Sequence, residues 1–267
     1  MRIALGITYG GTHYEGWQSQ PSGRTVQDQL QVALGKFMAG HAPQLLCAGR
    51  TDAGVHGLMQ VAHFDTDVQR PDTAWVRGTN RYLPADIAVQ WARHVPDGFH
   101  ARASALTRRY AYILLESPVR PSIDSSQVGW VFRPLSATAM REAALHLLGE
   151  HDFSSFRAAQ CQAHTPVKTL HRIDIHRHGR YWRFDFEGNA FLHHMIRNIM
   201  GCLVMIGQGS RPPDWMLSVL QARSREVAAP TFMADGLYFL GPTYAPEWQL
   251  PDDTAQFDWL PGAHTAG

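Results

Sequence analysis

The stretch Ala48–Phe64, AGRTDAGVHGLMQVAHF, places a glycine-rich loop directly before an apolar segment that is typical of a β-strand. The loop sets three glycines around one carboxylate, Asp52, with one guanidinium, Arg50, two residues earlier. Glycine permits tight turns and close approach of the backbone to a ligand, so the pattern predicts a rigid loop that presents Asp52. The alternative is a surface turn in which Asp52 caps backbone amides, because Gly and Asp are ordinary turn residues. Arg50 counts against that alternative, since a turn needs no cation there.

The predicted elements around this stretch alternate between strand and helix. Thr25 is a good N-cap for an amphipathic helix, because its hydroxyl can accept a hydrogen bond from a first-turn amide. In chain order we predict a strand at Arg2–Tyr9, a helix from Thr25 to Phe37, a strand at about Leu58–Asp65, a helix at Asp72–Arg81 capped by Asp72, and a strand at Ile87–His94. This order is typical of an α+β sandwich with helices on one face of a sheet.

The second half of the chain has a similar order of elements without repeating the sequence. Predicted strands are Arg109–Glu116, Leu170–His176, Tyr181–Glu187 and Gly236–Gly241, and predicted helices are Ser136–Leu148, Leu192–Ile206 and Pro213–Ala222, with a turn at His178–Arg180. We therefore predict an α+β fold with two similar α/β-sandwich, RRM-like halves, residues 1–105 and 106–245, whose antiparallel sheets are joined around a central cleft. The acidic, Pro-rich residues 246–267 are predicted to form a loosely packed tail.

Length and cysteine usage restrict the class of protein. The 267 residues suit one large or two medium domains. Cys47, Cys161 and Cys202 are an odd number at wide spacing, which argues against a disulfide framework and a zinc knuckle and favours a reducing compartment. No apolar run approaches the roughly 20 residues that cross a membrane, and no secretory signal is visible. We expect a cytoplasmic protein.

The charge is distributed unevenly. Of the 24 basic residues only Lys36 and Lys168 are lysine. Six of the 23 acids lie at or after Glu226, where Lys and Arg are absent, so residues 1–225 carry a net charge of +7. This charge is compatible with a polyanionic partner, because arginine pairs with phosphate in a two-point geometry and stacks on bases. Arginine enrichment from a GC-rich genome explains the same numbers, and charge alone does not separate the two interpretations.

A second candidate motif is Thr107–Tyr112, TRRYAY. On a strand, Tyr110 and Tyr112 share one face while Arg109 points to the other. An aromatic ring beside two arginines suits stacking on an extruded base, worth about 1–3 kcal/mol per base. The alternative is that both tyrosines are half-buried sheet residues, which is the commoner case.

A third candidate motif is Gly188–Asn198, GNAFLHHMIRN, at the start of a predicted helix. The predicted buried stripe of this helix is Leu192, Met195, Ile196, Ile199 and Leu203. Arg197 lies beside that stripe and needs a carboxylate partner, because a buried unpaired charge is costly. His193 and His194 point about 100° apart on a helix, so we predict no metal site there.

The sequence lacks the residues that ordinary glycoside hydrolysis and nucleotide-cofactor binding require. No second carboxylate with an obvious role accompanies Asp52, as ordinary glycoside hydrolysis requires. No phosphate-binding Gly-rich motif is present, so a nucleotide cofactor is not expected. From the residues alone, the candidate set is one aspartate, one tyrosine beside arginines and one helix arginine.

Eight motifs, in order and at family-like spacing, carry a resemblance. They are Gly16–Gln18, Thr25–Gln27, Gly49–His56, Leu83–Ile87, Phe99–Arg102, Arg109–Tyr110, Asn189–Asn198 and Gly236–Tyr238. With them the chain resembles the TruA-type tRNA pseudouridine synthases from about residue 3 to 245. It departs from the family at Gly10-Gly11, where Asp-Gly is common, and at Met59, where Gly is frequent. Neither position is catalytic in the family's motif.

The resemblance implies isomerisation of uridine to pseudouridine at positions 38–40 of the tRNA anticodon stem-loop, by a homodimer without cofactor or metal. It implies that Asp52 is the catalytic residue and that Arg197 pairs with it. Tyr110 would stack on the flipped uracil, Arg50 would help to extrude the base, and Leu237 would line the apolar side of the uracil pocket. The rival interpretations are a non-catalytic RNA-binding module and a glycosidase that acts on a nucleoside. The three differ in the product formed from unmodified tRNA: pseudouridine, unchanged RNA or free uracil.

Overall fold

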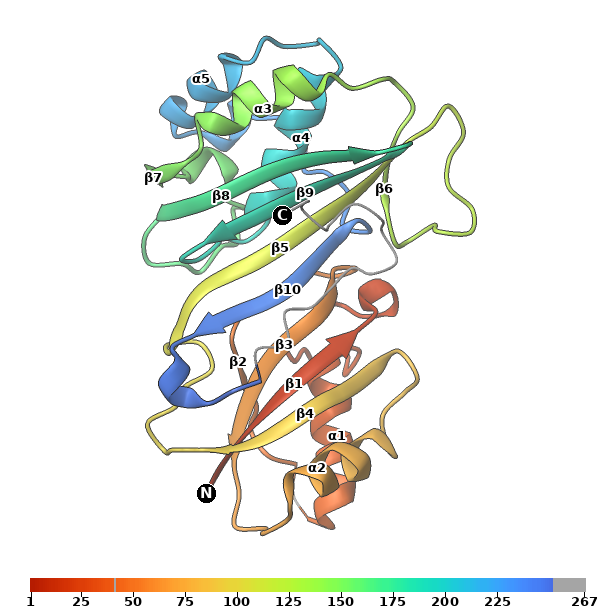
Figure 1. The fold of residues 1–267 in the computed structure, drawn as a ribbon, viewed down its shortest axis with the longest axis vertical. Coiled ribbons are helices and arrows are strands. Elements are labelled where there is room, and N and C mark those ends of the chain that lie inside the picture. The colour runs from red at the N-terminus through yellow and green to blue at the C-terminus, as the bar shows by residue number, and fades with distance from the viewer. Residues whose placement is uncertain (41, 252–267) are drawn as a thin grey trace. The chain divides into compact units, whose positions relative to one another are not determined.

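The computed structural model describes residues 1–40 and 42–251, and its chain divides into two compact units (Figure 1). Unit 1 contains Met1–Arg108 together with the described residues from Tyr238 onward, and unit 2 contains Arg109–Leu237. Each unit combines strands with helices, which confirms the mixed α/β class predicted from the sequence.

The sheet of unit 1 has the strand order β4-β1-β3-β10. β1 (Arg2–Tyr9) lies between β4 (Ile87–Val95) and β3 (His56–Asp65) and is antiparallel to both, with Leu5 opposite Ala62 of β3. β10 (Leu237–Tyr244) runs parallel to β3, and β2 (Leu46–Cys47) pairs antiparallel with β3. The predicted bounds of β1 are confirmed, and the short β2 has no counterpart in the prediction.

Helices α1 (Val26–Met38) and α2 (Asp72–Asn80) supply side chains to the core on one face of this sheet. Thr25 is the N-cap of α1, as predicted, and its hydroxyl accepts from the Asp28 amide at 3.2 Å. The predicted cap of α2 is wrong: Pro71 is the N-cap, and Asp72 is the first helical residue. The Asp72 carboxylate instead binds Arg93 and His94 of β4, at 3.1 and 2.9 Å, so a tertiary contact replaces the local one.

The other face of the unit 1 sheet has its own apolar cluster. Val61 and Trp91 pack there with Phe99, which follows β4. Tyr244 and Trp248 join the cluster, with ring centroids 5.3 and 5.4 Å from that of Phe99. Within residues 246–251 of the predicted tail, Trp248 and Leu250 thus pack against this cluster, and residues 252–267 lie outside the described residues.

The sheet of unit 2 has the order β5-β9-β8-β7. Its strands are β5 (Ala105–Glu116), β6 (Gly129–Val131, parallel to β5), β7 (Gly149–Asp152), β8 (Val167–His178) and β9 (Tyr181–Gly188). β8 and β9 form an antiparallel hairpin in which His178 pairs with Tyr181, so the predicted turn is confirmed. Gly179 has a φ of 58° in this turn, a conformation that glycine adopts without a steric penalty.

The helices of unit 2 are α3 (Ala137–Leu145), α4 (Met195–Gly207) and α5 (Trp215–Ala222). All five residues of the apolar stripe predicted for α4 are at most 4% exposed. The helix begins at Met195 and not at Leu192, because His194 has a left-handed backbone with a φ of 63°. The 3.6-residue period thus identified the buried face but not the first residue of the helix.

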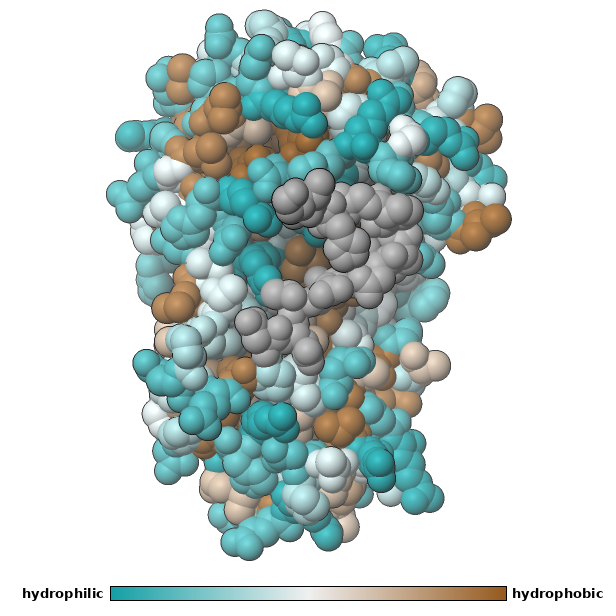
Figure 2. All heavy atoms as spheres, in the orientation of Figure 1, coloured by the Kyte–Doolittle hydropathy of each residue, from teal (hydrophilic) through white to brown (hydrophobic). Residues whose placement is uncertain are grey.

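Hydrophilic residues predominate on the face drawn in Figure 2, with hydrophobic ones scattered among them. The three cysteines all lie among the described residues and are free thiols. Within residues 1–40 and 42–251, no helix has the length and apolar character that a membrane span requires.

Candidate functional site

The loop that carries Asp52 connects β2 to β3 in unit 1 and depends on two glycines. Gly54, inside the loop, has a φ of 80°. Gly16, with a φ of 93°, packs against the loop so closely that a Cβ atom there would lie 2.6 Å from the carbonyl oxygen of Thr51. Side chains at these positions would be strained, and at Gly16 one would also displace the loop.

Thr51, the residue before Asp52, is the main anchor of the loop. It is 7% exposed, and its hydroxyl lies 2.8 Å from the buried hydroxyl of Tyr9. Its carbonyl accepts from the Trp17 amide at 3.0 Å, and the Asp52 carbonyl accepts from the Val55 amide at 3.1 Å. Asp52 itself is partly buried. The backbone around Asp52 is therefore fixed by hydrogen bonds of Thr51 and of the Asp52 carbonyl.

Two further side chains hold the start of the loop. The Gln60 amide donates to the Gly49 carbonyl at 2.5 Å. The Arg108 guanidinium donates to the carbonyls of Ala48, Ala105 and Arg102, at 3.3, 3.1 and 2.5 Å. The sequence indicates no role for Gln60 and marks Arg108 only as one of the two arginines beside Tyr110, because the contacts of Gln60 with Gly49 and of Arg108 with Ala48 span 11 and 60 residues of chain and leave no local pattern.

His56 closes the loop at the start of β3. Its Nδ1 accepts from the Gly11 amide at 3.0 Å, so this nitrogen carries no proton. Its ring stacks on Tyr238 of β10, with centroids 4.6 Å apart and 23° between the planes. His56 is 5% exposed, and this set of contacts describes a packed residue that connects the loop to two elements of unit 1.

Arg50 is exposed on the same loop as Asp52. Its charge reaches the neighbouring Cys47 thiol: burial raises the pKa of that thiol to about 12, while the positive charges of Arg50 and Arg102 act in the opposite direction. The loop thus presents a cation two residues from its carboxylate, and a second arginine of unit 1 contributes to the local positive potential.

Tyr110, Arg197 and Leu237 belong to unit 2. Tyr110 is 8% exposed, and its ring meets Phe191 edge-on, with centroids 5.0 Å apart and 73° between the planes. Leu237 is 5% exposed at the first position of β10, where its amide donates to the Ala234 carbonyl at 2.8 Å. Both side chains are thus more deeply buried than the half-buried sheet residue of the alternative interpretation of Tyr110.

Arg197 lies in the first turn of α4 and forms two hydrogen bonds with Phe232, one as donor and one as acceptor. Its Nε donates to the Phe232 carbonyl at 2.9 Å, and the Phe232 amide donates back to the Arg197 carbonyl at 3.1 Å. Because Nε lies in the guanidinium plane, this bond restricts the orientation of the whole group. The next residue, Asn198, is fully buried and binds the Phe156 carbonyl and the Thr231 hydroxyl, at 2.8 and 2.7 Å.

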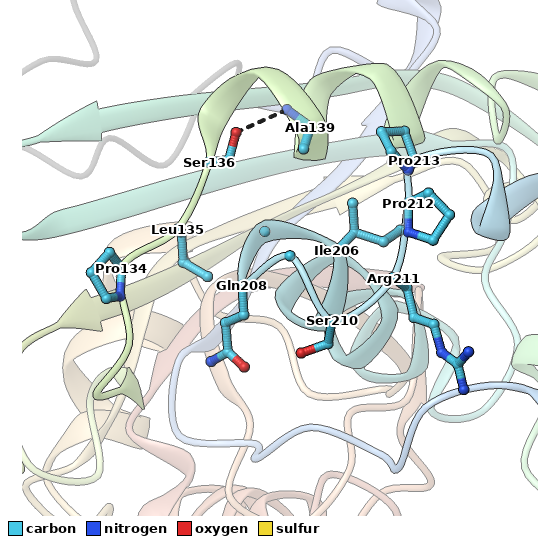
Figure 3. Close-up of a pocket in the computed structure, with 12 residues that line it drawn as sticks. Pro134, Leu135, Ser136, Ala139, Ile206, Gln208, Ser210, Arg211, Pro212 and Pro213 are labelled. Atoms are coloured by element: carbon cyan, nitrogen blue, oxygen red, sulfur yellow. Dashed lines mark hydrogen bonds between the residues drawn. The ribbon is translucent and has the colours of Figure 1, made fainter.

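A pocket of about 790 Å³ lies in unit 2, between the start of α3 and the segment that joins α4 to α5 (Figure 3). Leu135 and Ile206 are among its apolar lining residues, and Arg211 lines it while its guanidinium lies over the Trp215 ring at 5.4 Å. The residues predicted for the functional site do not line this pocket, so it is a separate feature of the helical layer of unit 2.

The family model of the tRNA pseudouridine synthases matches residues 7–102 and 143–245 of this chain. A protein named tRNA pseudouridine synthase A from Albidiferax ferrireducens is 69% identical over 261 residues, which cover 98% of this chain and all of the relative. Proteins of the same name from Polaromonas naphthalenivorans and Acidovorax sp. (strain JS42) are each 66% identical over 98% of this chain and their own full length.

These matches define the class of protein. The chain belongs to the tRNA pseudouridine synthase family, whose members are isomerases. A solved archaeal box H/ACA sRNP Nop10-Cbf5 complex is also similar, with 11% identity and a TM-score of 0.35 over 90% of this chain and 57% of that chain, a level that adds nothing to the assignment.

Proposed function

We propose that this protein isomerises uridine to pseudouridine at positions 38–40 of the tRNA anticodon stem-loop, with Asp52 as its catalytic carboxylate. Family membership supports the reaction class. The observation that supports the role of Asp52 is the fixed backbone directly before it. The Thr51 hydroxyl contacts the Tyr9 hydroxyl, and the Thr51 carbonyl accepts a hydrogen bond from the Trp17 amide. A carboxylate that must meet one atom of a bound nucleotide benefits from such a preorganised backbone.

The proposed reaction breaks the C1′–N1 glycosidic bond, turns the uracil and joins C1′ to C5. The proton of C5 is lost, and N1 ends with a proton in its place, so the product is an isomer of the substrate. The balance includes no oxidant, reductant or water, and the proposal therefore includes no cofactor.

In this proposal, Arg197 pairs with Asp52 and keeps it ionised and oriented, because a nearby guanidinium favours the charged carboxylate. The Phe232 carbonyl, which restricts the Arg197 guanidinium, supports a positioning role of this kind. Tyr110 stacks on the flipped uracil and Leu237 lines its apolar side; their burial among other apolar residues supports a preformed surface.

Arg50 helps to extrude the target base. Bases inside a stem are inaccessible, and unstacking one costs a few kcal/mol, which a side chain that fills the vacated space offsets. The exposure of Arg50, two residues from Asp52, supports this assignment. We further propose that two RRM-like halves enclose the cleft for the stem-loop, that the protein is a homodimer and that it acts in the cytoplasm.

Incubation of the protein with unmodified tRNA, with no added cofactor, tests the proposal. Mapping the modified positions after chemical labelling should place pseudouridine at positions 38–40. Asp52→Asn preserves the size of the side chain and removes its charge, so this variant should bind tRNA and form no pseudouridine. Unchanged RNA with the wild-type protein would indicate a binding module, and free uracil a glycosidase. Turnover by Asp52→Asn would contradict the role of Asp52.

A further inference from the structure

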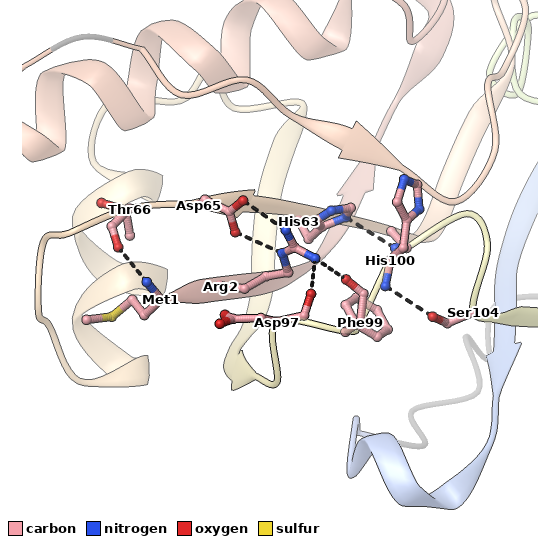
Figure 4. A network of polar contacts seen from close by, with 10 residues as sticks. Met1, Arg2, His63, Asp65, Thr66, Asp97, Phe99, His100 and Ser104 are labelled. Atoms are coloured by element: carbon pink, nitrogen blue, oxygen red, sulfur yellow. Dashed lines mark hydrogen bonds and ion pairs between the residues drawn. The ribbon is translucent and has the colours of Figure 1, made fainter.

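The loop from Asp97 to Ser104, which connects β4 to β5 in unit 1, is anchored at its start by Arg2 (Figure 4). One guanidinium nitrogen of Arg2 donates to the carbonyls of Asp97 and Phe99, at 2.5 and 2.7 Å. The other two nitrogens pair with the Asp65 carboxylate at 2.8 and 2.9 Å. Since Arg2 lies on β1 and Asp65 on β3, the start of the loop is tied to two central strands.

Two imidazoles hold the rest of this loop. His63 Nδ1 accepts from the Ala101 amide at 3.2 Å, and His100 Nδ1 accepts from the Arg102 and Ala103 amides at 3.1 and 3.3 Å. Burial lowers the pKa of His63 to about 4, so near neutral pH this ring is uncharged and its Nδ1 can accept. The amides of three consecutive residues are thus satisfied by side chains.

Arg102 combines a fixed backbone with an exposed side chain. Its amide is bound by His100, and its carbonyl accepts from Arg108 at 2.5 Å. The Arg102 residue is exposed, and its guanidinium has no hydrogen-bond or ion-pair partner among residues 1–40 and 42–251. By comparison, the exposed Arg93 guanidinium of the same unit is paired with Asp72.

The loop that presents Arg102 shares an anchor with the loop that presents Asp52. The same Arg108 nitrogen that donates to the Arg102 carbonyl also donates to the Ala48 carbonyl, two residues before Arg50. A solvated arginine at an arbitrary surface position needs no such connection. The shared anchor sets the Arg102 backbone at a defined position relative to the Asp52 loop.

We propose that Arg102 binds a phosphate of the tRNA strand whose base Arg50 extrudes, and so holds the substrate backbone beside Asp52. This inference rests on the proposed function. Arginine matches phosphate with two parallel hydrogen bonds, and phosphate contacts fix the register of a nucleic acid without reading its sequence. A rigid loop backbone lowers the entropy lost when such a contact forms.

Arg102→Ala and Arg77→Ala provide a matched test. Arg77 lies on α2, whose core residue Trp75 packs on the face of the unit 1 sheet opposite to that of Phe99, and Arg77 is also exposed. Affinity for unmodified tRNA is measured from low to moderate salt for both variants and the wild type, with thermal unfolding as a check of the fold.

Loss of one phosphate contact should reduce the slope of log affinity against log salt by about 0.7–0.9 in Arg102→Ala, with weaker binding at low salt. Arg77→Ala should keep the wild-type slope. A wild-type slope for Arg102→Ala, or equal changes in both variants, would overturn the inference. If the wild type forms pseudouridine while the Arg102→Ala slope is unchanged, only this inference fails; absence of pseudouridine with the wild type contradicts the proposed function itself.

Discussion

The hydroxyls of Tyr9 and Thr51 lie 2.8 Å apart in a buried contact that joins the end of β1 to the residue before Asp52. This contact spans 42 residues of chain, and Tyr9 also packs its ring near Trp17, with centroids 5.7 Å apart. The hydroxyl and the ring of Tyr9 therefore have separable roles, one in holding the loop and one in the core.

Tyr9→Phe removes the hydroxyl and keeps the ring. The Thr51 hydroxyl then loses this partner, and we expect kcat for pseudouridine formation to fall on the order of tenfold, because small displacements of a catalytic group are costly. Tyr14→Phe is the control, since it removes a hydroxyl that binds Asp86 at 2.6 Å in the same unit. Equal rates for Tyr9→Phe and the wild type would show that this contact does not position Asp52.

Gly16→Ala tests the close packing of the neighbouring turn on the Asp52 loop. A Cβ atom at Gly16 would lie 2.6 Å from the Thr51 carbonyl oxygen, whereas Gly23, also at positive φ, has no heavy atom within 4 Å of its added Cβ. Both variants carry backbone strain, but only Gly16→Ala adds a clash. We expect Gly16→Ala to lower the free energy of unfolding by about 1–3 kcal/mol more than Gly23→Ala, measured by denaturant titration.

Arg197→Lys retains the positive charge and removes the planar guanidinium. We expect the rate of pseudouridine formation to fall on the order of tenfold or more, because an ammonium loses both the Phe232 contact of Nε and the two-point geometry proposed toward Asp52. Arg141→Lys is matched to it, since Arg141 also donates through Nε to a backbone carbonyl, that of Ile175, at 3.1 Å.

Unfolding measurements on both arginine variants separate stability from catalysis. A loss of activity in Arg197→Lys that Arg141→Lys does not share, at comparable stability, supports a role in the reaction. Equal activity losses in the two variants would assign the effect to general destabilisation.

His63 should make the stability of the protein depend on pH. Burial lowers its pKa to about 4, from an ordinary value near 6.5, so between these values the unfolded chain binds a proton that the folded chain does not. Stability should therefore fall as the pH decreases from about 6.5 to 4, with a slope of at most about 1.4 kcal/mol per pH unit from this group. The guanidinium of Arg2 and the imidazole of His100 act in the same direction on the pKa of His63, and the Asp65 carboxylate opposes them.

His63→Asn keeps an acceptor near the position of Nδ1 and does not titrate. The difference in unfolding free energy between the wild type and this variant, measured across the same pH range, isolates His63 from the carboxylates. A difference that does not change with pH would contradict the assignment.

Short-range patterns in the sequence predicted the longer strands, the apolar faces and the candidate residues. The alternation in Arg2–Tyr9, the cap at Thr25 and the stripe on α4 each depend on residues a few positions apart. Motifs carried the family assignment in the same way. The short β2, β6 and β7, with two to four residues each, are too brief for a period to show.

The groups that hold the candidate residues became known from the three-dimensional fold and not from the sequence. Asp72 binds β4 instead of capping its helix, Tyr9 meets Thr51, and Arg108 joins two loops that are distant in sequence. Tyr238 and Phe239 of β10 pair in parallel with β3, although residues 109–237 of unit 2 separate them from β3 in the chain. The Asp72–Arg93, Tyr9–Thr51 and Arg108–Ala48 contacts join residues that are 21, 42 and 60 positions apart in the chain. Whether such groups meet depends on the packing of whole elements, and no local propensity encodes it.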